Sequence, residues 1–301
     1  MAGLTPMMQQ YMETKKQYKD CILFYRLGDF YEMFFEDAIT ASRELEITLT
    51  GKDCGLEERA PMCGVPFHAV DGYLNRLVSK GYKVAICEQV EDPKLAKGIV
   101  KREVIRIVTP GTNLNTQALE ESKNNYLMCI ACFQNRIGVS IVDVTTGDFY
   151  MTEVEGLAKL QDEIYKYMPT EIICNDAFVM SGYDIEDLKG RLGMAVYTLE
   201  PWYFDDDGCR KCLMNHFKVN TLAGLGLEDF PSGMISAGAA MQYLLETQKT
   251  DLTHINHIIP YLASRFMLLD SSTRRNLELT ETLREKQKKG SLLWVLDKTK
   301  T

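Results

Sequence analysis

Two cysteine pairs have the Cys-X-X-Cys spacing that can hold a metal ion. Cys129 and Cys132 lie in an apolar run of strand character, YLMCIACF, where residues three apart point to opposite faces, so their thiols are predicted to diverge. Cys209 and Cys212 could bind zinc together with His216, but the sequence offers no matching second pair of ligands. Structural cysteines, buried or half-buried, are the favoured interpretation, and a zinc site is the alternative.

The acidic and histidine residues do not form a convincing catalytic group. Asp143 and Asp148 flank a Thr-Thr-Gly turn and could hold magnesium in a nuclease, but such a site needs three or four converging acids. A role in a hairpin turn is favoured for both. His254 and His257 could chelate a metal, yet no carboxylate pair accompanies them, and they are expected to be polar helix residues. With no GxxxxGK[ST], GxGxxG, HExxH or GxSxG motif, the chain is predicted to have no catalytic, cofactor or metal site.

The stretch LGDFYEMFFEDA, residues 27–38, combines aromatic and acidic residues after a glycine. Asp29 is a candidate N-cap of a helix, and Glu32 stands three residues later, as in a capping box. The helical period places Phe30 within about 40° of the predicted core stripe, so periodicity favours a core position for its ring. The stripe itself consists of Phe34, Ala38, Ala41 and Leu45.

Composition and charge restrict where a nucleic-acid surface could lie. The chain has 301 residues, 46% of them hydrophobic, a net charge of −8, and nine cysteines, an odd number that favours reduced thiols in the cytoplasm. It has neither an apolar run long enough for a membrane span nor a signal peptide. Residues 1–115 carry 15 basic and 16 acidic residues, whereas the remainder carries 19 and 26. The net charge argues against a general nucleic-acid binder, and a DNA-contacting surface, if present, belongs in the nearly neutral first part and not in the acidic second part.

The pattern of elements predicts an α/β protein with several domains. Residues 1–115 alternate strand and helix, which predicts a compact domain with a mixed sheet. Residues 116–125 are polar and turn-prone, which is typical of a linker. Residues 126–250 begin with a three-stranded meander and continue as a second α/β domain. Residues 251–301 are helix-rich and are expected to be the start of a third domain, in which the chain is cut.

Several motifs in series carry a family resemblance. TPMMQQY, FYRLGDFYEMFFEDA, PMCGVPFHAVDGYL, VAICEQVEDP and VIRIVTPGT closely resemble, in this order and spacing, the N-terminal portion of bacterial MutS DNA mismatch-repair proteins. LDSSTRRNLELTETL looks like the start of the family's core domain, so the last segment is expected to be a truncated helical core domain. Residues 126–250 agree more loosely with the family's connector domain, which is ribonuclease H-like without the nuclease. The resemblance thus implies a mismatch-recognition domain followed by a connector domain.

The family's F-x-E motif matches Phe30-Tyr31-Glu32. The resemblance implies that the Phe30 ring inserts from the minor groove and stacks on a mispaired base, while Glu32 hydrogen-bonds the displaced base. Unstacking a base step costs a few kcal/mol, and less where the pair is already mismatched. A carboxylate near phosphates ordinarily repels DNA. Glu32 can therefore favour mismatches only if the kinked geometry offers it a donor or if it binds in its protonated form.

Other residues near this motif are candidates for contacts to sugar and phosphate. For each basic candidate the alternative interpretation is a solvated surface charge that does not contact DNA, and for the methionine it is a side chain packed in the protein. These candidates are Lys52, Arg59, Met62, Lys94, Lys97, Lys101 and Arg102.

The resemblance also implies partners and a location. A complete family member continues through lever, clamp and ATPase domains, binds ATP and Mg²⁺, and is a homodimer. With no phosphate-binding loop, this fragment is expected to bind no cofactor and not to be an enzyme, and whether it is a monomer is open. Mismatched duplex DNA and a MutL-type protein, bound through the connector domain, are the expected partners, in the cytoplasm at the nucleoid and away from any membrane. The alternatives are a protein-interaction fragment with little DNA binding of its own and a nuclease-like enzyme using the second domain.

Overall fold

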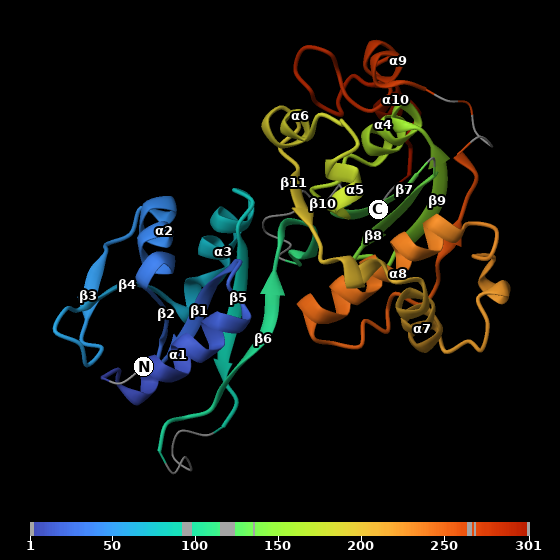
Figure 1. Cartoon of the computed structure of the whole chain (residues 1–301). Coiled ribbons are helices and arrows are strands. Elements are labelled where there is room, and N and C mark those ends of the chain that lie inside the picture. The colour runs from blue at the N-terminus through green and yellow to red at the C-terminus, as the bar shows by residue number, and fades with distance from the viewer. Residues whose placement is uncertain are drawn as a thin grey trace.

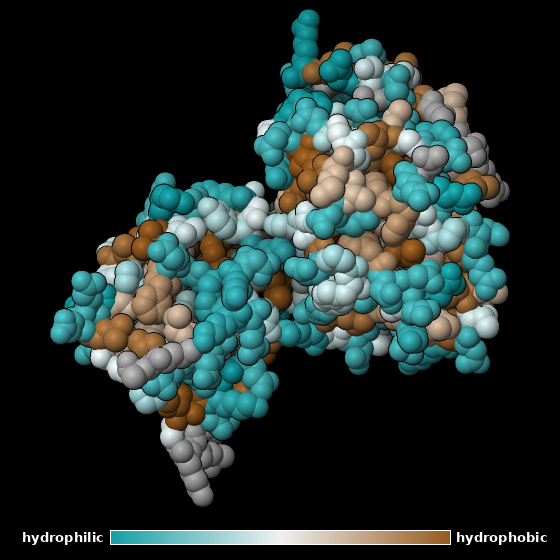
Figure 2. Space-filling model, in the orientation of Figure 1, coloured by the Kyte–Doolittle hydropathy of each residue, from teal (hydrophilic) through white to brown (hydrophobic). Residues whose placement is uncertain are grey.

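The computed structural model describes residues 3–91, 98–114, 124–134, 136–263, 267 and 269–299. They form two α/β units, each built around a six-stranded sheet (Figure 1). The predicted α/β class with mixed sheets is confirmed. Figure 2 shows the units as two lobes whose visible face is mostly hydrophilic. Within the described ranges, no helix has the length and apolar character needed to cross a bilayer.

The first sheet has the strand order β3-β4-β2-β1-β5-β6, and only the β1–β5 pair is parallel. Helix α1 packs on one face, where Met8 and Tyr11 join the buried residues of β1. Helices α2 and α3 pack on the other face. The bounds of these elements are α1 Pro6–Gln17, β1 Cys21–Leu27, β2 Phe30–Phe34, α2 Phe35–Leu45, β3 Thr50–Lys52, β4 Ala60–Pro66, η1 Phe67–Ala69, α3 Val70–Val78, β5 Lys83–Gln89, β6 Arg102–Val108 and η2 Pro110–Thr112.

The second sheet has the strand order β11-β10-β7-β8-β9-β12. Strands β7, β8 and β9 form the predicted antiparallel meander, and β10 lies parallel to both β7 and β11. This order agrees with the predicted ribonuclease H-like arrangement. Its strands are β7 Tyr126–Phe133, β8 Arg136–Asp143, β9 Phe149–Glu155, β10 Glu171–Cys174, β11 Ala195–Thr198 and β12 Ile259–Pro260.

Helices cover both faces of the second sheet, and the core lies in two layers on either side of it. Helices α4, α5 and α6 pack on one face, and α7 and the long apolar α8 pack on the other. Their bounds, with those of the short helices, are α4 Leu157–Tyr167, α5 Asp176–Val179, α6 Ile185–Gly190, η3 Pro201–Phe204, α7 Asp206–Phe217, η4 Ala223–Leu225, α8 Pro231–Gln248, α9 Ser271–Asn276 and α10 Leu292–Leu296.

The segment after α8 continues the second unit before any further helix forms. Leu252, Ile255 and Ile258 are buried in the core layer beneath α8. Strand β12 then pairs with β9 at the edge of the sheet. The helical character predicted from residue 251 onward is found only in the short helices α9 and α10 of the described residues.

Glu171, at the start of β10, is a fully buried carboxylate where the two units meet. Its Oε2 accepts hydrogen bonds from the Thr109 hydroxyl (2.5 Å) and the Gly111 N–H (2.7 Å), both from the chain that follows β6. Its Oε1 accepts one from the Tyr243 hydroxyl of α8 (2.6 Å). Burial raises the pKa of Glu171, and these hydrogen bonds only partly offset that effect.

Replacing Glu171 with glutamine is expected to make stability less sensitive to pH. Because the folded-state pKa of Glu171 is raised, its contribution to stability is complete below the ordinary value of 4.5 and is lost as pH rises through the folded-state pKa. A glutamine can accept from Gly111 and donate to Tyr243 without that loss. In thermal unfolding from about pH 4.5 to about pH 8, the melting temperature of the variant should therefore rise relative to that of the wild type as pH rises. A difference in melting temperature that is constant over this range would contradict the assignment.

Candidate nucleic-acid interface

The chain at residues 27–34 forms a β-hairpin. Strands β1 and β2 are joined by a two-residue turn, with Leu27 opposite Phe30. Gly28 has a φ of +57°, and positive φ at the first turn position is what tight hairpin turns require. The predicted helix capped by Asp29 and Glu32 is wrong at this point, because the helix begins only at Phe35. Pairing of β2 with both β1 and β4 outweighs the local helical pattern.

Phe30 lies at the tip of this hairpin with 46% of its surface exposed, so the core position favoured by periodicity is wrong. Phe30 and Phe34 share one face of the strand, since side chains alternate along it. Phe34 is buried against Tyr11 of α1, with ring centroids 4.9 Å apart. Phe30 is four residues nearer the turn, about 13 Å along the strand, and it stays exposed.

The predicted core stripe is confirmed as buried, but it is divided between two elements. Phe34 belongs to β2 and packs on the α1 side of the sheet. Ala38, Ala41 and Leu45 belong to α2 and pack on the opposite side. The division follows from the change from strand to helix between Phe34 and Phe35.

Glu32 lies in the middle of β2 and forms an ion pair with Lys52 of β3. The Lys52 ammonium is 2.5 Å from Glu32 Oε2, and the two side chains are 31% and 17% exposed. Gly64 of β4 stands opposite Glu32, and a Cβ there would lie 3.5 Å from Glu32 Cγ. Lys52 stands opposite Ala60, four residues along β4 from Gly64, so its side chain reaches Glu32 diagonally across that strand. The same ammonium lies 5.5 Å from the centre of the Phe34 ring.

The other predicted contact residues have different environments. Arg59 is exposed in the loop before β4 and has no ion pair within the described part of the chain. Met62 is half-buried against the core beneath α1, which favours its packed alternative. Lys101 is exposed and pairs with Glu103 at 2.5 Å. Lys94 and Lys97 lie outside the described residues.

Arg102 is half-buried and is engaged by the chain itself. Its guanidinium donates hydrogen bonds to the carbonyls of Arg26 (2.7 Å) and Val100 (2.9 Å) and to Gln10 Oε1 (3.1 Å). It also lies 5.1 Å from the centre of the Tyr25 ring. These contacts give Arg102 a structural role in joining β6 to α1 and β1.

A second exposed aromatic near Phe30 was missed in the sequence. Phe67 is 42% exposed, and its N–H donates to the carbonyl of Asp29 in the hairpin turn at 2.9 Å. The Arg26 guanidinium lies 3.9 Å above the Phe67 ring and also donates to the Gly28 carbonyl at 2.6 Å. Arg26 thus braces both the hairpin turn and the aromatic beside it. No pattern in the sequence singled out Phe67.

The strand that carries Phe30 and Glu32 is held firmly on its other face. Tyr31 is 5% exposed, and its hydroxyl donates to Glu88 of β5. The Arg26 guanidinium pairs with the same carboxylate at 3.6 Å. Burial is the first cause that raises the pKa of Tyr31, and the bond to Glu88 raises it further. The neutral hydroxyl therefore remains available to hold β2 in place.

Asp143 and Asp148 of the second unit accept hydrogen bonds within a hairpin turn. Asp143 is fully buried, and its Oδ1 accepts from the N–H (2.8 Å) and hydroxyl (2.5 Å) of Thr145. Its Oδ2 accepts from the N–H of Asn125 at 3.1 Å, and Asp148 accepts from the Thr146 hydroxyl at 2.9 Å. The predicted role in a hairpin turn is confirmed. Across the residues that the structure places, no cluster of three or more His, Cys, Asp or Glu side chains could hold a metal ion.

All nine cysteines are free thiols, buried or half-buried, as the favoured interpretation predicted. Cys129 and Cys132 diverge to the two core layers of the second sheet. Burial raises the pKa of Cys209 to about 12 and that of Cys212 to about 11, which disfavours the thiolate that zinc requires.

The histidines contact backbone or neighbouring side chains. His216 lies 2.6 Å from the Ile255 carbonyl, and His254 lies 2.8 Å from the Val144 carbonyl. His254 and His257 precede β12 in chain without helical structure, so the prediction of helix residues is wrong there.

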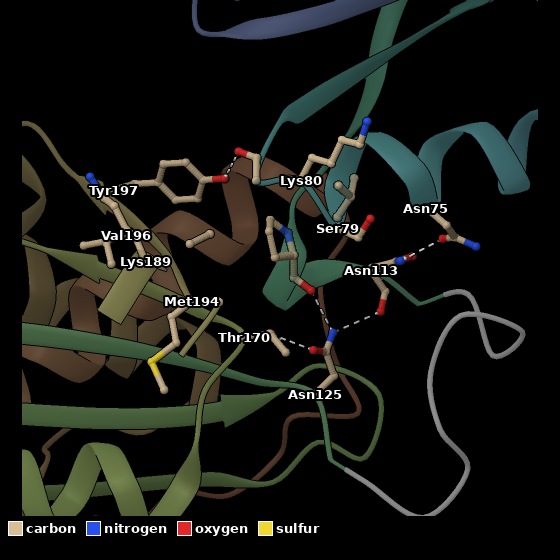
Figure 3. A pocket seen from close by; sticks show the side chains of 15 residues that line it. Asn75, Ser79, Lys80, Asn113, Asn125, Thr170, Lys189, Met194, Val196 and Tyr197 are labelled. Carbon is tan, nitrogen blue, oxygen red and sulfur yellow. Dashed lines mark hydrogen bonds between the residues drawn. The ribbon is translucent and has the colours of Figure 1, made fainter. Parts of the chain in front are cut away.

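A cavity of about 600 Å³ lies where the two units meet (Figure 3). Its polar lining groups bond to one another. Asn125 donates to the carbonyls of Pro110 (2.9 Å) and Asn113 (3.4 Å), and the Tyr197 hydroxyl donates to the Gly81 carbonyl (2.7 Å). The cavity is therefore a polar seam between the units, and the charged side chains among its described lining residues, Lys80 and Lys189, form ion pairs with Glu44 and Glu186.

Two protein-family models match the chain. The model described as MutS domain I matches residues 5–117, and the model described as MutS domain II matches residues 125–256.

Curated relatives match along the whole chain. A protein named DNA mismatch repair protein MutS from Lachnoclostridium phytofermentans is 69% identical over 301 residues, covering 100% of this chain and 32% of the relative. Proteins of the same name from Ruminiclostridium cellulolyticum and Acetivibrio thermocellus are 57% and 56% identical, covering 100% of this chain and 34% and 35% of the relatives. The chain therefore spans about a third of the length of these relatives. With two domain models that together span most of the sequence, the chain belongs to the MutS family.

Proposed function

We propose that this chain recognises mismatched or unpaired bases in duplex DNA, with Phe30 inserted from the minor groove and Glu32 reading the displaced base. The observation that carries the proposal is the 46% exposure of Phe30 at the tip of a braced hairpin, in a strand whose next four residues are buried or half-buried. Single exposed apolar side chains are common on protein surfaces, so the weight lies in the position of Phe30, at the tip of a hairpin that strand pairing and Arg26 hold in place.

Energy favours weakly paired sites for such a ring. Opening a base step costs a few kcal/mol, and a mismatched step costs less because its pairing and stacking are already weakened. Mismatched steps are also easier to kink. A ring on a braced strand loses little conformational entropy when it inserts, because β2 is already held by Tyr31 and its bond to Glu88. The Phe30 ring therefore acts as a wedge that detects weak base pairing and does not need to read the base sequence.

Basic residues around the hairpin would supply contacts to the backbone of the duplex. Arg59 is the exposed candidate with no ion pair among the described residues, so its guanidinium is the one best able to reach a phosphate. Lys101 would have to share its charge with Glu103. The near-neutral charge of the first unit fits modest, mismatch-dependent binding better than strong general affinity for DNA.

Substituting Glu32 with glutamine is expected to weaken discrimination. The carboxylate repels the phosphates of an intact duplex, whereas a displaced base can donate to it. Glu32→Gln removes the repulsion, so affinity for a matched duplex should rise by about threefold to tenfold, with a smaller change for a G·T duplex. Fluorescence anisotropy titrations with matched and G·T duplexes of the same sequence, at fixed low salt, measure both affinities.

The wild type in the same titrations tests the proposed function itself. It should bind the G·T duplex more tightly than the matched duplex. Equal affinity for the two duplexes would contradict the proposal and favour a protein-interaction fragment with little DNA binding of its own.

The family membership supports further proposals for the organisation of the chain. We assign residues 1–115 to mismatch recognition, 116–125 to a linker, 126–250 to a connector domain and 251–301 to the start of a core domain. The connector would bind a MutL-type partner, and a complete protein would be a homodimeric ATPase that uses ATP and Mg²⁺. A cytoplasmic location at the nucleoid stays a prediction from the sequence.

A further inference from the structure

The ion pair between Glu32 and Lys52 places a positive charge on the side chain proposed to read the base. The ammonium contacts Oε2 at 2.5 Å, and within the described ranges no hydrogen bond to Oε1 is seen. The strand neighbours of Glu32 are Tyr25 on β1 and Gly64 on β4, neither of which brings a charge. Lys52 is therefore the counter-ion of Glu32 in the DNA-free protein.

This geometry differs from that of a lysine free to reach phosphate. The Lys52 side chain is only 31% exposed, and its ammonium lies between Glu32 and the face of Phe34, 5.5 Å from that ring. Moving it to a phosphate would leave the Glu32 carboxylate, 17% exposed, without its partner. Lys101, by comparison, is well exposed and pairs with Glu103 away from the hairpin strand.

Resting on the proposed function of Phe30 and Glu32, we propose that Lys52 is a specificity-determining residue that sets how strongly Glu32 opposes intact DNA. On a matched duplex no base offers Glu32 a donor, so Lys52 alone offsets the repulsion between carboxylate and phosphates. On a mismatched duplex the displaced base donates to the carboxylate and shares this role. Lys52 thus limits the penalty on intact duplex, which allows the protein to remain on DNA while it searches.

The test measures the ratio of the dissociation constants for matched and G·T duplexes by anisotropy. In Lys52→Met, affinity for both duplexes should fall, and the matched duplex should lose more, so the ratio should rise by about twofold to fivefold, the range of half-exposed ion pairs. Lys52→Arg, which can keep the ion pair, should retain the wild-type ratio. Lys101→Met removes the same charge from an exposed site and should leave the ratio unchanged.

A double variant separates an effect of Lys52 through Glu32 from a direct contact between Lys52 and a phosphate. When Lys52→Met is added to Glu32→Gln, no carboxylate remains to be neutralised, so both duplexes should lose affinity by the same factor. Circular dichroism melts establish that each variant is folded. If the wild type discriminates but the ratio in Lys52→Met stays constant or falls, the proposed role of Lys52 is overturned and the proposed function is not affected. A wild type that binds both duplexes equally overturns the proposed function and this inference together.

Discussion

Phe30→Ala is expected to abolish the preference for mismatched DNA and to leave the protein folded. Stacking of an aromatic ring on a base contributes about 1–3 kcal/mol, so affinity for a G·T duplex should fall by about 5- to 150-fold. Affinity for the matched duplex should hardly change, because the ring does not insert there. With 46% of its surface exposed, Phe30 contributes little to the core, and stability should stay within about 0.5 kcal/mol. Anisotropy titrations and thermal melts measure the two quantities.

Phe67→Ala is the matched control for this substitution. Phe67 is the same residue type with a similar exposure, 42%, and it lies beside the same turn. Its ring is occupied by the Arg26 guanidinium, so its loss should affect both duplexes to the same extent. If Phe30→Ala likewise weakened both duplexes equally, the wedge assignment would be wrong.

Gly138→Ala should have the largest effect on stability. Gly138 lies in β8 directly beneath the N-terminal turn of α8, and a Cβ there would lie 1.9 Å from the Ser232 carbonyl oxygen and 2.8 Å from the Gly233 nitrogen. Backbone atoms cannot rotate away as a side chain can, so the whole of α8 must shift from the sheet. We expect a loss of about 3 kcal/mol or more, which corresponds to a fall in melting temperature of about 6–12 °C.

Gly72→Ala provides the comparison. Gly72 lies in α3, its backbone is helical, and a Cβ added there would meet no heavy atom within 4 Å apart from the backbone of its own helix. Alanine should therefore stabilise the protein by about 0.5–1 kcal/mol. If Gly138→Ala melted at the wild-type temperature, the close contact between α8 and β8 would be refuted.

The general architecture could be predicted from local patterns. The meander of β7, β8 and β9 follows from strand-like runs separated by turn pairs, and the Asp143 turn follows from its Thr-Thr-Gly sequence. The divergence of Cys129 and Cys132 follows from strand alternation alone. These features depend on neighbours in the sequence, which is why the sequence contains enough information to predict them.

The structure of residues 29–34 could not be predicted in this way. A short run of aromatic and acidic residues fits both the helical period and strand alternation. The choice depends on β4, about thirty residues away, which pairs with β2 from Phe30 to Phe34. Local periodicity therefore placed Phe30 in the core, and the exposed position became evident only from the sheet.

The environment of Glu32 depends on the same long-range pairing. Lys52 stands opposite Ala60 of β4 and Glu32 stands opposite Gly64, so the ion pair spans that strand. The sequence singled out Lys52 only as a basic residue in a loop, because charge alone does not reveal its partner. Likewise, the bracing of Phe67 by Arg26 joins residues from separate elements.

Photo-cross-linking is the most direct test of whether the Phe30 ring stacks on the mispaired base. A duplex with 5-iodouracil at the mispaired thymine of a G·T site would be irradiated with the wild-type protein, and the linked peptide identified by mass spectrometry. We expect a cross-link to Phe30 that is strong with the mismatch, weak when the same iodouracil is paired with adenine, and lost in Phe30→Ala. Equal cross-linking of both duplexes, or a cross-link at another residue that persists in Phe30→Ala, would contradict the proposed recognition of mismatches.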